Sequence, residues 1–181
     1  MWLRLYSMLL IKTILLIGMT LTGGKGHAQP TDGGQEPIVI YVSKVKHILQ
    51  VKRGDTVLEA YKCVLGGDPI NDKKFEGDQC TPEGVFHIIS KVPHRSWDVF
   101  MGIDYPTTDS WRKFERNKAM SKVPHNARIG GSIGIHGVPE GRSDLIDKNI
   151  NWTLGCISLR NADVEKLYKL VDVGTEVIIT K

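Results

Sequence analysis

The sequence predicts a single, mostly β domain, with mixed β-sheets in a sandwich- or barrel-like arrangement and about two helices. Short segments rich in β-branched and aromatic residues recur along the chain, and turn-forming residues separate them. Glycine is abundant, at 19 of 181 residues, which favours turns and strands over a helical bundle. No internal repeat or linker divides the chain.

Seven segments have the composition of strands. They are residues 38–42, 47–52, 56–65, 85–92, 133–136, 154–159 and 175–180. The second and third are joined at Arg53-Gly54-Asp55, where the Gly-Asp pair favours a hairpin turn. Residues 66–84 and 137–151 are polar and contain glycine, which predicts two long loops.

Two further segments predict helices. Residues 109–120 place Trp111, Phe114 and Met120 among many charged residues, which indicates an exposed amphipathic helix. In residues 162–171 the apolar side chains share one face. We expect Asn161 to cap the N-terminus of this helix.

Residues 1–28 have the pattern of a secretory signal peptide. Arg4 and Lys12 precede a short apolar core, and Gly26-His27-Ala28 places small residues before a cleavage site. We expect export across the inner membrane to the periplasm, with an uncleaved anchor as the alternative. Residues 29–37 then form a polar leading segment, and residues 38–181 form the single folded domain.

The charge balance argues against a nucleic-acid partner. The formal net charge of +4 falls to +1 without the leader, which carries three basic groups and no acid. The remaining basic residues do not cluster as a nucleic-acid footprint requires. No apolar run reaches the roughly 18 residues of a membrane span, so we expect no stable membrane insertion after leader cleavage.

The residues with the clearest chemical potential are Cys156 and His136. A neighbouring imidazole can convert a thiol into the thiolate that acts as an acyl-transfer nucleophile. No carboxylate is adjacent in sequence, so the backbone carbonyl of Gly137 is a candidate for orienting the imidazole. The N–H groups of Gly155 and Cys156 are candidates for an oxyanion hole. A lone cysteine in an apolar segment is more often packing than nucleophile, so the residues alone leave both roles open.

Several segments, taken in order, resemble the L,D-transpeptidase (YkuD-like) catalytic domain. The His-Gly of residues 136–137 is followed by the Thr-Leu-Gly-Cys of residues 153–156, similar to the family's histidine and [Ser/Thr]-x-Gly-Cys motif. Residues 77–84, Gly-Asp-Gln-Cys-Thr-Pro-Glu-Gly, are similar to its Gly-Asp-x-x-Thr-Pro-Glu-Gly segment. Residues 104–106 resemble its Tyr-Pro segment. The matches extend from Ile38 to the end of the chain.

The resemblance implies an enzyme that acts on peptidoglycan stem peptides without metal or organic cofactor. In the family, the cysteine attacks the carbonyl between the L-configured centre of a diamino acid and the terminal D-alanine, which leaves. An amine of a second stem peptide, or of a lipoprotein lysine, resolves the thioester. Here the resemblance implies Cys156 as nucleophile, His136 as base and then acid, and Gly137 as its orienting group. Thr153 and Gly155 would shape the elbow that presents the sulfur.

One departure concerns substrate binding. Many members carry arginine two residues after the cysteine, where this chain has Ser158. Arg160 is a candidate for supplying the missing charge, because a guanidinium suits carboxylates, although a helix cap or a solvent-facing role stays open. Tyr105 and Trp152 are candidates for lining the stem-peptide groove, with partly buried structural roles as the alternative.

Other assignments fit the sequence less well. A zinc peptidase needs converging ligands, yet no His-x-x-x-His pair occurs and no histidine follows His136. A sortase-like enzyme places its histidine much further upstream of the cysteine. A papain-like order would require Cys63 or Cys80, which we instead consider as a disulfide pair in an oxidising periplasm. A non-catalytic wall-binding module of the same fold is the remaining alternative.

The sequence therefore predicts an exported cysteine L,D-transpeptidase with roles in peptidoglycan synthesis, cell wall biogenesis and cell shape. Its alternative is a hydrolase of the same fold, an L,D-endopeptidase or carboxypeptidase that cleaves peptidoglycan or lipoprotein linkages. Both reactions pass through the same thioester, and the outcome depends on whether an amine or water reaches it.

Overall fold

The computed structural model describes residues 36–181. The predicted signal peptide (residues 1–28) and most of the polar leading segment (residues 29–37) lie outside the described residues. Among the residues described, no helix has the length and apolar character needed to cross a membrane.

Eight strands form one mixed sheet. They are β1 (Ile38–Ser43), β2 (Ile48–Arg53), β3 (Thr56–Lys62), β4 (Gly84–His94), β5 (Asp98–Ile103), β6 (Gly134–His136), β7 (Ile157–Ser158) and β8 (Glu176–Thr180). Their order across the sheet is β3-β2-β1-β8-β4-β5-β6-β7. β1 pairs in parallel with β8, and β6 pairs in parallel with β7, whereas the other neighbours are antiparallel. The expectation of a mostly β fold with mixed pairing is confirmed.

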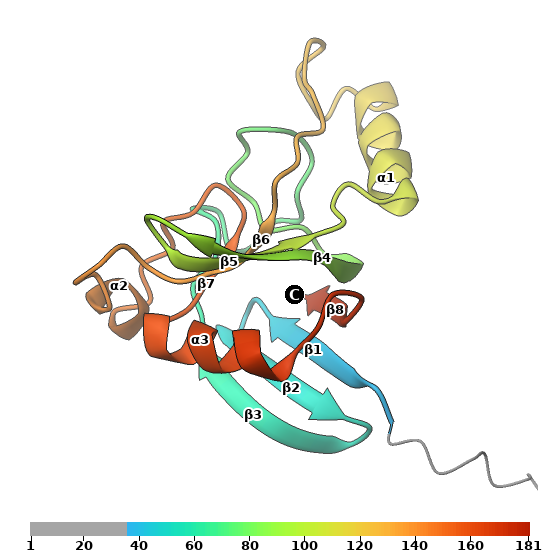
Figure 1. Ribbon diagram of the computed structural model, residues 1–181. Helices are drawn as coiled ribbons and strands as arrows, with labels where there is room; N and C mark the ends of the chain where they lie inside the picture. The colour runs from blue at the N-terminus through green and yellow to red at the C-terminus, as the bar shows by residue number, and fades with distance from the viewer. Residues whose placement is uncertain (1–35) are drawn as a thin grey trace, which may run out of the picture. The chain divides into compact units, whose positions relative to one another are not determined.

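The long strand β4 joins the two halves of the sheet. Its first part, Gly84–His87, pairs with β8, and its second part, beginning at Ile88, pairs with β5. The register shifts between Ile88 and Ser90, and such an irregularity bends a strand. In Figure 1, β1, β2 and β3 lie below β4 and β5. Apolar side chains from both halves belong to one buried core, which runs from Ile40 on β1 to Met101 on β5.

Within residues 36–181, three helices accompany the sheet: α1 (Thr108–Ala119), α2 (Asp144–Asp147) and α3 (Asn161–Leu170). The predicted helices at 109–120 and 162–171 are confirmed to within one residue. α3 contacts β5 and β6 and buries Val164 and Leu167 in the core. The single-turn α2 lies in a segment that the sequence predicts as loop.

One strand was missed, and one local prediction was wrong. β5 was not anticipated, because its sequence, Asp-Val-Phe-Met-Gly-Ile, includes aspartate and glycine, which strands usually lack, and only pairing with β4 and β6 orders it. Asn161 does not cap α3. The capping position is Arg160, and the Asn161 side chain instead accepts a hydrogen bond from the Val138 N–H at 2.8 Å. This bond ties the start of α3 to the chain that follows His136.

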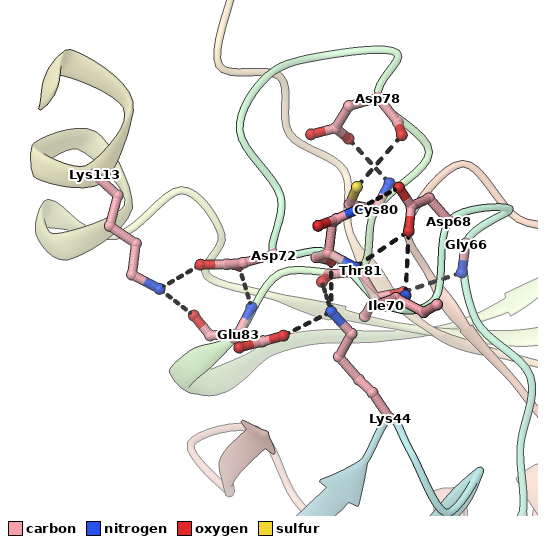
Figure 2. A network of polar contacts seen from close by, with 11 residues as sticks. Lys44, Gly66, Asp68, Ile70, Asp72, Asp78, Cys80, Thr81, Glu83 and Lys113 are labelled. Carbon is pink, nitrogen blue, oxygen red and sulfur yellow. Dashed lines mark hydrogen bonds and ion pairs between the residues drawn. The ribbon is translucent and has the colours of Figure 1, made fainter. Parts of the chain in front are cut away.

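A buried ionic network anchors the long loop between β3 and β4 (Figure 2). The ammonium of Lys44, which is 1% exposed, donates to Glu83 Oε1 at 2.8 Å and to the Thr81 carbonyl at 3.2 Å. Lys113 of α1 donates to Asp72 Oδ2 at 2.8 Å and to the Glu83 carbonyl at 2.7 Å. The loop is therefore held from β1 and from α1 at once.

Replacing Lys44 should destabilise the protein more than replacing Lys113. We expect Lys44→Met to cost about 3 kcal/mol, because it leaves a partly buried carboxylate and buried carbonyls without their donor. Lys113→Met is the matched control. Its ammonium is 42% exposed, so the expected loss is below about 1 kcal/mol. Urea denaturation of both variants measures the difference, and equal losses would contradict a network centred on Lys44.

Candidate active site

The parallel pairing of β6 and β7 brings His136 close to Cys156. In this register Ile135 lies opposite Ile157, and His136 lies opposite Ser158. Cys156 immediately precedes β7, so it lies beside Gly134 at the start of β6, two residues before His136 and therefore on the same face of the sheet. Both Cys156 and His136 line one cavity with a volume of about 610 Å³.

The imidazole of His136 is oriented by the peptide that follows it. Nδ1 lies 2.7 Å from the Gly137 carbonyl oxygen, and a carbonyl can only accept, so Nδ1 carries the proton and Nε2 has a free lone pair. The same carbonyl accepts the Ser158 hydroxyl at 3.0 Å. The Gly137 N–H donates to the Trp97 carbonyl at 3.0 Å. A Cβ at Gly137 would come within 2.7 Å of that carbonyl, so this close approach requires glycine.

Aromatic rings enclose the imidazole. The ring of Trp97 stacks on it with centroids 4.6 Å apart, and Trp152 meets it edge-on at 5.6 Å. Phe100 lies at 6.1 Å, and His136 is only 1% exposed. This burial lowers the pKa of His136 from its ordinary value of 6.5 to about 4; the hydrogen bond to Gly137 opposes the shift, and the charge of His94 adds to it. The imidazole is therefore neutral at pH 7.

Thr153 shapes the elbow that carries Cys156. Its hydroxyl accepts the Gly155 N–H at 3.1 Å and donates to the Cys156 carbonyl at 2.7 Å. Gly155 has a φ of +137°, and a Cβ there would lie 2.7 Å from the Cys80 carbonyl, so the position demands glycine. Because this elbow occupies residues 153–156, the strand predicted for 154–159 is limited to Ile157–Ser158. The Gly155 N–H already donates to the Thr153 hydroxyl. Of the two N–H groups considered for an oxyanion hole, the Cys156 N–H therefore stays the candidate.

The thiol of Cys156 is half-buried and neutral at rest. Its Sγ donates to the Ser132 carbonyl at 3.6 Å, and within residues 36–181 no hydrogen bond joins it to His136. Burial raises the thiol pKa, while a hydrogen bond from the Gly134 backbone and the positive charge of Lys73 act in the opposite direction. The sulfur therefore shares a cavity with the imidazole without forming a resting ion pair.

The other substrate-binding candidates separate into two groups. Trp152 lines the cavity. Tyr105 does not line the cavity. Its hydroxyl donates to the Ile129 carbonyl at 3.2 Å, and its side chain is buried in the hydrophobic core. Arg160 also lies outside the cavity lining and pairs with Asp147. Its position does not support the carboxylate-binding role that the sequence suggested.

Sequence reasoning missed several cavity residues. The most prominent are Trp97 and Phe100 on the β4–β5 hairpin, and Lys73 on the long loop. A signal for Lys73 exists in the Gly-Asp motif, because the ammonium of Lys73 bonds to Asp78 Oδ1 at 2.8 Å. Trp97 carries no comparable signal, since its place depends on a hairpin that the sequence did not predict.

The disulfide hypothesis was wrong, because all three cysteines are free thiols. Cys63 follows β3 rather than lying within a strand, and burial raises its pKa to about 12. The thiol of Cys80 donates to the Asp78 carbonyl at 3.4 Å; burial, followed by the charge of Asp78, raises its pKa to about 11. Neither thiol lines the cavity that holds His136. Within residues 36–181, histidine, cysteine and acidic side chains form no group of three or more suited to a metal ion.

The amino-acid sequence also matches the model of a known protein family. Residues 37–179 match the family model of YkuD, the L,D-transpeptidase catalytic domain. The chain belongs to this family. A search of the curated proteins found no match.

Solved structures show the same fold. A mutant form of the helical cell shape determining protein Pgp2 from Campylobacter jejuni superposes with a TM-score of 0.59 at 25% identity, covering 82% of this chain and 49% of that one. Bd1075 of Bdellovibrio bacteriovorus superposes with a TM-score of 0.56 at 18% identity, covering 81% of this chain and 48% of that one. An L,D-transpeptidase from Mycobacterium smegmatis superposes with a TM-score of 0.53 at 15% identity, covering 82% of this chain and 60% of that one. The chain thus spans about half the length of Pgp2 and Bd1075.

Opening the aromatic enclosure should raise the pKa of His136. Trp97→Ala admits water to the imidazole, and water stabilises the charged form. The pKa of His136 should therefore move from about 4 towards 6.5. Trp111→Ala, an exposed tryptophan on α1 that does not line the cavity, is the matched control and should leave it unchanged. NMR titration of the His136 ring protons measures both. An unshifted inflection in Trp97→Ala would show that the stacked ring does not set the proton affinity.

Proposed function

We propose that the protein is an exported cysteine L,D-transpeptidase that modifies peptidoglycan stem peptides through a thioester on Cys156. The observation that carries the proposal is the shared cavity, in which a neutral imidazole with a free Nε2 lone pair stands near an accessible thiol. Membership of the family supplies the reaction class. The half-burial of Cys156 supports a substrate-facing role over pure packing.

The first step forms the thioester. The Cys156 side chain turns about its Cα–Cβ bond, away from the Ser132 carbonyl and towards the imidazole. As Sγ attacks the scissile carbonyl carbon, the thiol proton passes to Nε2 of His136. Since the imidazole pKa is low and the thiol pKa is raised, this transfer accompanies attack rather than preceding it.

The surrounding hydrogen bonds suit each stage of that step. The Cys156 N–H stabilises the negative charge that develops on the carbonyl oxygen. The Gly137 carbonyl stabilises the imidazolium through Nδ1–H. When the carbon–nitrogen bond breaks, Nε2 returns its proton to the departing amino group, so D-alanine leaves and the acyl group remains on sulfur.

The second step resolves the thioester. An amine of a second stem peptide, or of a lipoprotein lysine, gives up a proton to His136 and attacks the thioester carbonyl; a new amide forms and Cys156 leaves as the thiol. Water in the same place yields a free carboxylate, the hydrolase outcome. Similarity to Pgp2, described as a helical cell shape determining protein, supports a role in cell wall biogenesis and cell shape in the periplasm.

Cys156→Ala should abolish turnover of tetrapeptide muropeptides, by at least about 1,000-fold, because no other group supplies the nucleophile. Cys80→Ser is the matched control. Its hydroxyl can keep the bond to the Asp78 carbonyl, so activity should persist. Chromatography of the products distinguishes the reactions: released D-alanine with new dimers indicates transfer, and shortened stems alone indicate hydrolysis. Turnover that survives in Cys156→Ala would refute the mechanism.

A further inference from the structure

We propose that Lys73 binds the terminal carboxylate of the peptide whose amide bond Cys156 attacks, and thereby selects donors with a free C-terminus. This inference rests on the proposed function and adds a substrate-recognition residue to it. Lys73 is the only lysine or arginine, among the residues described, that lines the cavity of Cys156 and His136. Arg160, which the sequence suggested for this role, is paired with Asp147 elsewhere.

The ammonium of Lys73 is buried with part of its donor capacity unused. Its side chain is 3% exposed, and it donates to Asp78 Oδ1 at 2.8 Å and to the Cys80 carbonyl at 3.5 Å. An ammonium has three N–H donors, so one has no acceptor in the described part of the chain. A buried cation is costly unless it is fully paired. A substrate carboxylate in the cavity would complete its coordination.

Asp78 does not cancel this charge at the cavity. Its carboxylate also accepts the backbone N–H groups of Lys74 at 2.6 Å, Phe75 at 3.0 Å and Cys80 at 3.0 Å. Its negative charge is therefore spread over four donors that lie on its own loop. Consistent with this, the charge of Lys73 lowers the pKa of Cys156, and Asp78 is not among the groups that act on that thiol.

The acidic group at the cavity does not compete for the same role. Glu76 lines the cavity, but its carboxylate pairs with Arg128 at 2.9 Å and both side chains are well exposed. Hydration and this ion pair weaken the repulsion that Glu76 exerts on an incoming anion. Glu76 is therefore a weak opponent of an anion that binds to Lys73.

The terminal carboxylate is the substrate anion that fits this position. It belongs to the residue that leaves, and only a few covalent bonds separate it from the carbonyl that the sulfur attacks. The side-chain carboxylate of a diamino acid lies further along the substrate. A cation in the same cavity as Cys156 is therefore suited to the terminal group, and an internal linkage without such a carboxylate lacks this contact.

The test compares a tetrapeptide muropeptide with its C-terminal amide. We expect wild-type kcat/KM to be at least about tenfold higher for the free acid, since the amide cannot form the charge-assisted hydrogen bond with Lys73. Lys73→Met should bring the ratio close to one, and Lys73→Arg should retain a preference for the acid. Lys74→Met, the same change one residue away and outside the cavity lining, should keep the wild-type ratio.

Two further measurements separate this role from others. If Lys73 acted only on the thiol, Lys73→Met would slow both substrates equally and shift the pH dependence of Cys156 alkylation by iodoacetamide. A preserved acid preference in that variant would overturn the inference. Should Lys73→Met fail to fold, wild-type inhibition by D-alanine but not by D-alaninamide supports it, and equal inhibition overturns it. Failure of the proposed function would be distinct: the wild type would turn over neither substrate.

Discussion

The parallel pairing of β6 with β7 is the constraint on which the site depends. These strands are short, yet their register sets His136 opposite Ser158 and places Cys156 beside Gly134, on the same face of the sheet as His136. It also brings the Ser158 hydroxyl to the Gly137 carbonyl, which accepts hydrogen bonds from both this hydroxyl and the imidazole N–H. A slip of one residue would turn each side chain to the opposite face, and the cavity would lose the Cys156 thiol.

The electrostatics of the cavity follow from the burial of its side chains. Burial lowers the pKa of His136 and raises that of Cys156, so both groups are neutral at rest. Neutral partners avoid the cost of burying an unsupported ion pair. The long loop between β3 and β4 adds the positive charge of Lys73 beside them, and the network around Lys44 holds that loop in place (Figure 2). Fold stability and site geometry are therefore coupled through one loop.

Local patterns predicted much of the fold and the centre of the site. Strand composition, helix periodicity and the motifs ending at Gly137 and Cys156 are short-range features, and the motifs identified Cys156 and His136, which line the cavity. Long-range pairing decided the rest. The β4–β5 hairpin places Trp97 on the imidazole, and Arg160 is drawn to Asp147 away from the cavity. Neither contact follows from spacing along the chain, because both depend on how separate segments pack.

The account turns on a covalent acyl group carried by Cys156, and trapping that group tests it most directly. The protein is mixed with a tetrapeptide muropeptide without added amine, quenched in acid within the first turnover, digested and mapped by mass spectrometry. The account predicts a tripeptide-acyl thioester on the peptide that contains Cys156, lost on treatment with hydroxylamine. Acylation of another residue, or rapid D-alanine release with no acyl-enzyme at any quench time, would contradict it.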